Sequence, residues 1–135
     1  MIDIEYKVMN AIREGLDEAD YEHVAVIPEY IDEAPSYPCV SVRESNSSTL
    51  MASVSGFNEE NHDEKMYTIE LFTNNKSGSK LTAKKIYKII DETMLSIGFS
   101  RTFLEAIPNF LDATIYRMTG RYVGVVDKDL KIHRR

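Results

Sequence analysis

Hydrophobic residues recur at intervals of three and four between Ser79 and Phe99, and this stretch predicts the clearest helix of the chain. Its apolar side comprises Ala83, Ile86, Ile90, Met94 and Ile97, and its polar side comprises Lys84, Lys88, Asp91 and Glu92. Ser79 is the expected N-cap, and Gly98 can adopt the positive φ of a helix stop. Phe99 is then expected to fold back on Met94, so that the chain leaves the helix toward a strand.

A second helix is predicted from Asp3 to Leu16, with Asp3 as its N-cap. Its narrower apolar stripe consists of Ile4, Val8, Ile12 and Leu16, joined by Ala11. Pro28, Pro35 and Pro38 exclude a regular helix between the first predicted strand and the next, so this connection is expected to be an ordered loop.

Short β-branched or alternating segments predict the strands. They are His23–Ile27, Cys39–Arg43, Lys65–Thr73, Arg101–Ile107 and Ala113–Val126. Ser45–Val54 is predicted to be a second hairpin arm, Gly56–Glu64 a solvated loop, and Pro108 with Asn109 a turn. Gly120 is either a hairpin turn or a bulge, and we favour the bulge because β-formers flank it.

These elements predict an α+β fold: a mostly antiparallel sheet of four to six strands with two helices packed against it. At 135 residues the chain is expected to be a single domain, residues 1–135, with residues 127–135 as a flexible tail. No apolar run is long enough for a membrane span, and the amphipathic N-terminus does not resemble a secretory signal. We therefore expect no membrane association and a chain that stays in the compartment where it is made.

Charge and candidate chemistry narrow the function further. Sixteen basic and 22 acidic residues give a net charge of −6, which argues against a surface built to bind nucleic acid. The one cysteine, Cys39, is expected to be a buried thiol. The three histidines lie in unrelated segments, and the acidic residues of the Gly56–Glu64 loop lack calcium-loop spacing. We expect no enzyme, no catalytic residue, no cofactor and no metal.

The eight tyrosines allow three interpretations. They could stack on single-stranded nucleic acid, which the net charge opposes, or anchor a protein interface near Arg117 and Arg121, or line the core. Lining the core is the commonest role for any single tyrosine.

Several short motifs together resemble the tail terminator proteins of tailed bacteriophages, which complete the tail and join it to the head. The motifs are Tyr37-Pro38-Cys39-Val40-Ser41-Val42, Tyr67-Thr68-Ile69-Glu70-Leu71-Phe72, Ile97-Gly98-Phe99, Tyr116-Arg117-Met118 and Arg121-Tyr122-Val123-Gly124. Their order matches as well, and the resemblance spans nearly the whole chain, although none of the motifs is a catalytic signature.

The resemblance implies a structural protein of the virion, assembled in the host cytoplasm and located in the tail at the head-tail neck. Such a protein forms a ring, usually a hexamer, that caps the head-proximal end of the tail tube and stops its polymerisation. Its implied partners are itself, the tail tube protein and the head completion or connector protein, and DNA passes through the lumen without specific binding. We place the expected subunit or partner contacts at Tyr116, Arg117, Arg121, Tyr122, Phe57, Glu59 and Glu60.

Three alternatives remain open. The chain could be a small monomeric binding module on a ferredoxin-like sheet, or another component of the head-tail connector. A hydrolase that uses Glu70 and the acidic loop is a third hypothesis, but it lacks a positioned base and an oxyanion site.

Overall fold

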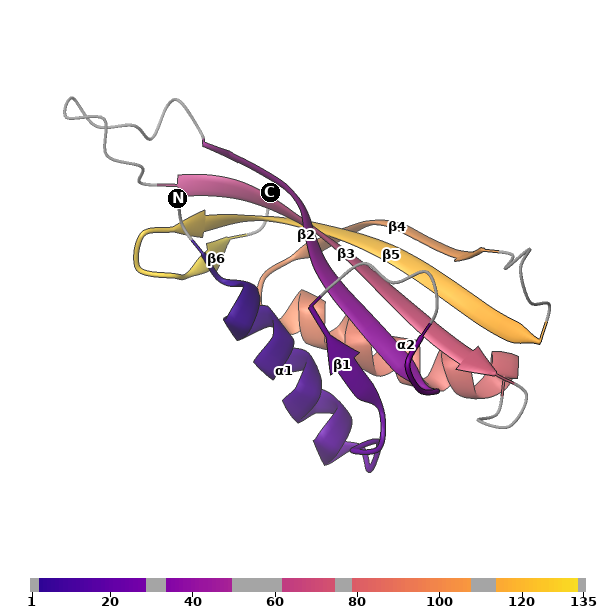
Figure 1. The fold of residues 1–135 in the computed structure, drawn as a ribbon. Helices are drawn as coiled ribbons and strands as arrows, with labels where there is room; N and C mark the ends of the chain where they lie inside the picture. The colour runs from indigo at the N-terminus through magenta and orange to yellow at the C-terminus, as the bar shows by residue number, and fades with distance from the viewer. Residues whose placement is uncertain (1–2, 29–33, 50–61, 75–78, 108–113, 134–135) are drawn as a thin grey trace, which may run out of the picture.

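The computed structural model describes residues 3–28, 34–49, 62–74, 79–107 and 114–133. These residues form two helices and a six-stranded, mostly antiparallel sheet, so the predicted α+β fold is confirmed (Figure 1). The helices are α1 (Glu5–Glu18) and α2 (Ser79–Ser96). The strands are β1 (Ala25–Ile27), β2 (Cys39–Thr49), β3 (His62–Asn74), β4 (Ser100–Ile107), β5 (Ile115–Asp127) and β6 (Ile132–His133).

The sheet has the order β1-β2-β3-β5-β4, and β6 pairs with β5 beyond this path. Strand β1 is parallel to β2, and the other pairs are antiparallel. Both helices lie on one face of the sheet (Figure 1), which we call the helix face; the other is the outer face. Strand β5 lies between β3 and β4, so the connection through α2 passes over one strand.

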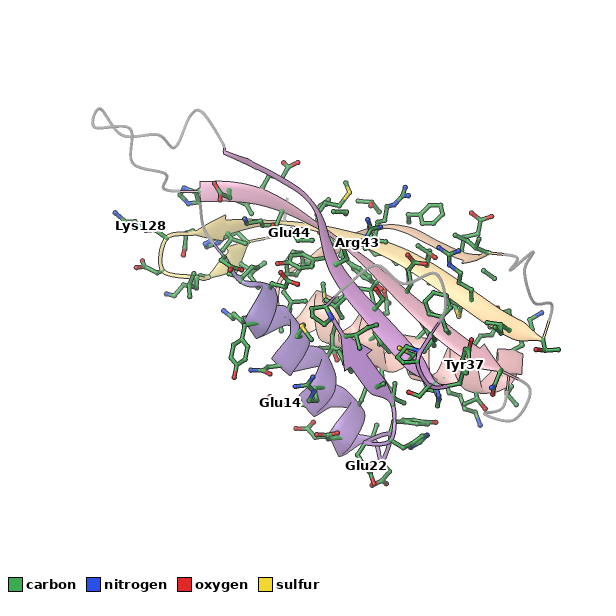
Figure 2. The ribbon with its side chains drawn as sticks, viewed as in Figure 1. Glu14, Glu22, Tyr37, Arg43, Glu44 and Lys128 are labelled. Carbon is green, nitrogen blue, oxygen red and sulfur yellow. The ribbon has the colours of Figure 1, made fainter. Side chains whose placement is uncertain are left out.

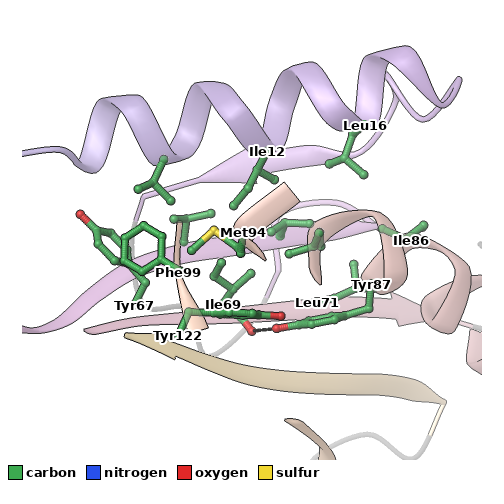
Figure 3. Packing of buried hydrophobic residues seen from close by; sticks show 14 of the residues in the cluster. Ile12, Leu16, Tyr67, Ile69, Leu71, Ile86, Tyr87, Met94, Phe99 and Tyr122 are labelled. Carbon is green, nitrogen blue, oxygen red and sulfur yellow. Dashed lines mark hydrogen bonds between the residues drawn. The ribbon is translucent and has the colours of Figure 1, made fainter. Parts of the chain in front are cut away.

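The main core fills the space between the helices and the sheet (Figure 3). From the helices it includes Ile4, Val8, Ile12, Leu16, Ala83, Ile86, Tyr87, Ile90 and Met94, and from the strands Val40, Val42, Tyr67, Ile69, Leu71 and Tyr122. The predicted stripes of both helices are therefore buried, except for Ala11 and Ile97, which are half-buried. A smaller cluster of Ala34, Cys39 and Phe72 lies apart from this core, and the buried state predicted for Cys39 is confirmed.

The stop of α2 follows the predicted geometry. Gly98 has a φ of 114°, its amide donates to the Leu95 carbonyl at 3.3 Å, and the Phe99 amide donates to the Met94 carbonyl at 3.0 Å. This is the Schellman pattern, which satisfies two carbonyls of the last turn. The predicted capping by the Ser79 side chain lies outside the described residues.

The start of α1 differs from the prediction. The helix begins at Glu5 with Ile4 as its N-cap, and Asp3 instead accepts a hydrogen bond from the Glu5 amide at 3.1 Å. Asp3 therefore stabilises the first turn from just outside the helix.

Strand β2 corrects the predicted hairpin between Cys39–Arg43 and Ser45–Val54. Residues 39–49 form one strand that pairs with β3, with a register shift between Glu44 and Asn46. At this shift Ser45 Oγ donates to the Met66 carbonyl at 3.3 Å and accepts from Thr68 Oγ1 at 2.9 Å. Pairing with β3 keeps the polar run extended, and residues 50–54 lie outside the described part of the chain.

Strand β3 begins three residues before the predicted Lys65, so Asp63 and Glu64 are in a strand and not in a solvated loop. Asp63 is 2% exposed, because it faces the core side at the end of β3. Residues 56–61 of the predicted loop, and Pro108 and Asn109 of the predicted turn, lie outside the described residues.

Two expectations for the C-terminal part are wrong. Strand β5 pairs with β3 without a register shift through Gly120, and the bulge lies on β4 between Arg101 and Phe103. Residues 127–133 are not a frayed tail, because β6 pairs with β5 and the Asp127 carboxylate accepts the Asp129 and Lys131 amides at 2.9 Å each.

Candidate interaction surface on the sheet

The outer face of β5 carries both arginines of the predicted interface. Because β5 is regular, Arg117 and Arg121, four residues apart, lie on the same face. Arg43 on β2 (Figure 2) belongs to the same cross-strand row as Arg121, since both pair with Thr68 of β3. Three arginines therefore lie on one face of a chain whose net charge is −6.

Arg117 is held in an ion pair. Its Nε donates to Glu70 Oε2 at 2.6 Å, its Nη2 contacts the same oxygen, and Thr119 Oγ1 donates to that oxygen at 3.5 Å. The Arg117 guanidinium also lies over the Phe72 ring, 5.6 Å from its centroid. Glu70 is only 4% exposed, so the pair is largely withdrawn from water and has a structural role.

Arg121 is exposed, and it is the better surface candidate. Its guanidinium lies 5.0 Å from the centroid of the half-buried Phe103 ring on β4. Such stacking holds the long side chain in place without neutralising its charge. Arg121 therefore offers an oriented cation on the outer face.

The two tyrosines of the predicted interface face the opposite side. Tyr122 is fully buried in the main core, and its hydroxyl donates to Asp91 Oδ1 at 2.9 Å. Tyr116 is half-buried and packs against the same core. Tyr122 is two residues after Gly120, so both positions are on the helix face of β5, beneath α2. The expectation that Tyr122 anchors an interface is therefore wrong. Phe57, Glu59 and Glu60 lie outside the described residues.

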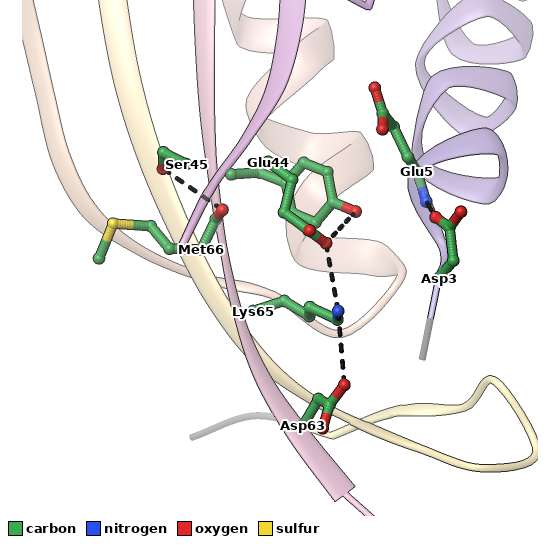
Figure 4. A network of polar contacts seen from close by, with 8 residues as sticks. Asp3, Glu5, Glu44, Ser45, Asp63, Lys65 and Met66 are labelled. Atoms are coloured by element: carbon green, nitrogen blue, oxygen red, sulfur yellow. Dashed lines mark hydrogen bonds and ion pairs between the residues drawn. The ribbon is translucent and has the colours of Figure 1, made fainter. Parts of the chain in front are cut away.

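A polar network closes the end of the sheet near the start of α1 (Figure 4). Lys65 is completely buried, and its Nζ lies 3.4 Å from Glu44 Oε1 and 3.5 Å from Asp63 Oδ2. Tyr67 donates its hydroxyl proton to Glu44 at 3.2 Å. Burial, followed by the nearby Glu44 carboxylate, raises the pKa of Tyr67 above its usual range. The network therefore holds its tyrosine neutral and its lysine between two carboxylates.

The charges around this network also affect α1. Burial, with the Asp3 and Glu44 carboxylates nearby, raises the pKa of Glu5. Lys65 and Asp63 lie on β3 and Glu44 lies on β2, and these strands are adjacent only in the folded chain, so no local sequence signal marks the network.

Two of the three histidines, His62 and His133, lie close together although they are far apart in the sequence. The His62 and His133 rings are 6.3 Å apart between centroids, and His133 Nε2 lies 2.9 Å from Asp127 Oδ2. Among the residues that the structure describes, no three His, Cys, Asp or Glu side chains are arranged to hold a metal ion. No helix within the described ranges is long and apolar enough to cross a membrane.

The scan against protein-family models gives no match, and the comparison with curated protein sequences gives none either.

Proposed function

We propose that the chain is a tail terminator of a tailed bacteriophage: a ring, expected to be a hexamer, that caps the head-proximal end of the tail tube. In this role it stops polymerisation of the tube protein and joins the tail to the head connector. The observation that carries the proposal is the ordered set of motifs that resembles this family. In the fold these motifs fall on β2, β3 and β5, the three central strands, and on the stop of α2.

The charges of the chain support this role. Double-stranded DNA must pass through the ring, and a basic lumen would retain it through its phosphates. A net charge of −6 is compatible with a lumen that is not basic. A closed ring also needs two different contact surfaces on each subunit, and the outer face with Arg121 differs in composition from the α2 surface.

The ring contact can be tested at Arg121. Arg121→Glu reverses an exposed charge, so the fold should be retained, whereas Arg117→Glu would oppose Glu70 and destabilise the subunit itself. Lys128→Glu, an exposed charge reversal on the β5–β6 turn, is the matched control. The proposal expects Arg121→Glu to lower ring formation and the capping of polymerising tube protein, with Lys128→Glu unchanged.

The readouts are the mass of the purified assembly by light scattering and the lengths of tubes grown with and without the chain. Tubes that grow equally long with and without the wild-type chain would contradict terminator function. Normal rings from Arg121→Glu would remove only this arginine from the contact.

A monomeric binding module is the second candidate, and the exposed arginine on a face without helices is the observation that favours it. The described elements follow the order α-β-β-β-α-β-β-β, which differs from the β-α-β-β-α-β order of a ferredoxin-like domain. The described elements therefore do not have the ferredoxin-like topology that this alternative assumed from similar numbers of helices and strands. A purified chain that remains monomeric at all concentrations would favour it.

A further inference from the structure

A basic cavity lies between α2 and the β4 edge of the sheet, on the helix face. It has a volume of about 260 Å³ and is open to solvent. Its apolar lining consists of the buried Tyr87 and Met118 and of Leu104, which is 37% exposed, and its charged lining consists of Lys84, Lys88, Arg101 and Asp91. The cavity is thus lined by both apolar and charged side chains.

The charges of the lining do not cancel. Asp91 is already engaged, since its carboxylate accepts the Tyr122 hydroxyl at 2.9 Å and lies 3.2 Å from Arg101 Nη1. Lys84 and Lys88 are exposed, four residues apart on α2, and the ion pairs found among the described residues include neither of them. An occupant should therefore bring two negative charges beside an apolar group.

The size of the cavity favours a peptide segment. Pockets for drug-sized ligands usually have volumes of about 300–1,000 Å³, so this cavity suits one or two side chains better than a free small molecule. Within this sequence, Phe57-Asn58-Glu59-Glu60 places an aromatic residue directly before two carboxylates. Its composition is complementary to that of the cavity.

The two glutamates of the segment cannot reach the lysines at the cavity of their own chain. Leu104 pairs with Gly120, and Gly120 with Ile69, seven residues beyond His62. With about 3.3 Å per residue along a strand and about 4.8 Å between strands, Leu104 lies roughly 25 Å from the start of β3. Glu60 is two residues before His62, so an extended chain carries it at most about 7 Å. A gap of roughly 18 Å therefore remains for Glu60 even if the segment points straight back, and Phe57, which an extended chain carries at most about 18 Å, remains roughly 7 Å short.

We propose that this cavity receives the Phe57–Glu60 segment of a second copy of the chain. Phe57 would cover the apolar lining at Leu104, and Glu59 and Glu60 would pair with Lys84 and Lys88. The contact is head-to-tail, because the segment and the cavity are different surfaces, and repetition of such a contact can close a ring. The inference depends on the proposed function only for the ring; the contact itself can be tested on the isolated chain.

The direct test is binding of a labelled synthetic peptide of residues 54–61 to the purified chain, followed by fluorescence anisotropy. We expect saturable binding that weakens with added salt, because exposed charges are screened. Lys84→Glu with Lys88→Glu should weaken binding by roughly tenfold or more, the effect of about 1.4 kcal/mol. Lys85→Glu is the matched control, since Lys85 is an exposed neighbour on α2 outside the cavity lining.

A peptide with both glutamates replaced by glutamine should also lose binding. No saturable binding, or equal binding by the Lys84/Lys88 double variant and the Lys85 control, would overturn the proposal. Circular dichroism of each variant checks that a loss of binding is not a loss of fold.

Charge exchange tests the contact in the assembly. The full-length chain with both lysines reversed, and the chain with Glu59→Lys and Glu60→Lys, should each assemble poorly, and a chain that carries all four changes should regain assembly. Failure of the fourfold variant to regain assembly, while its fold is intact, would exclude this pairing. Peptide binding that follows these expectations in a chain that does not limit tail length would leave the inference standing and remove the proposed function.

Discussion

Replacing Gly120 by alanine should destabilise the fold, although Gly120 lies in a regular strand where alanine is normally accepted. An added Cβ would collide with the Tyr87 hydroxyl, and it would lie 3.0 Å from Tyr87 Cζ and 3.2 Å from Tyr122 Cε2. The Tyr87 hydroxyl cannot simply move away, because it is buried and donates to the Ile69 carbonyl at 2.8 Å, as the dashed line in Figure 3 shows.

The magnitude follows from three contributions. Crowding in a packed core costs about 1–3 kcal/mol. Loss of the buried hydrogen bond to Ile69 costs a further 1–3 kcal/mol or so. Alanine recovers about 0.4–1 kcal/mol by restricting the unfolded chain. The expected net loss for Gly120→Ala is therefore about 2–4 kcal/mol, or roughly 8–16 °C in Tm at about 4 °C per kcal/mol.

Urea unfolding of Gly120→Ala, Tyr87→Phe and the double variant provides the assay. Tyr87→Phe alone should cost about 1 kcal/mol through the lost hydrogen bond. In the Gly120→Ala background, Tyr87→Phe should destabilise the protein less or even stabilise it, because it removes the hydroxyl with which the new Cβ collides. The double-mutant cycle should therefore give a coupling energy of about 1 kcal/mol or more. Gly120→Ala within about 0.5 kcal/mol of wild type, or strictly additive effects, would refute the packing described for Tyr87.

Three further predictions concern the core and its charges. Ile90→Ala removes a completely buried side chain from the α2 stripe and should cost about 2–5 kcal/mol in urea unfolding, whereas a cost below about 0.5 kcal/mol would place Ile90 outside the core. Glu70→Gln leaves Arg117 without its partner carboxylate and should lower the free energy of unfolding by about 1–3 kcal/mol. This loss is smaller than for a fully buried ion pair, because the Arg117 side chain remains 26% exposed. An unchanged urea midpoint would contradict this expectation. The raised pKa values of the buried Tyr67, Tyr87 and Tyr122 mean that their stabilisation is fully present below the usual tyrosine pKa of 10.0 and is lost as the pH rises above it. Absorbance at alkaline pH should therefore show these phenols ionising together with unfolding, and ionisation near pH 10 in the folded protein would contradict their burial.

The helices could be predicted because their signals are local. The stripe from Ala83 to Met94 and the positive-φ position at Gly98 depend on residues within one or two turns of each other, so the sequence contains them directly. Strand pairing depends on distant residues. The polar run after Ser45 was predicted to form a hairpin arm, but pairing with β3 extends it into one strand.

The candidate contact residues show the same division. Arg117 and Arg121 lie four residues apart on the same face of β5, yet Glu70, 47 residues before Arg117, pairs with Arg117 and not with Arg121. The flanking β-formers favour a bulge at Gly120, and no sequence signal reveals that Tyr87, on a distant helix, places its hydroxyl against that strand position. The cavity at Leu104 likewise combines α2, β4 and β5, and its lysines appeared in the sequence only as the polar side of a helix.

The most direct test of the proposed function is the length of tails made by the phage when this chain is absent. Electron microscopy of lysates from a phage with the gene deleted should show tails of uncontrolled length that are not joined to heads. Supplying the wild-type chain from a plasmid should restore a single tail length and infectious particles. Tails of normal, uniform length joined to heads in the complete absence of the chain would contradict the assignment as a tail terminator.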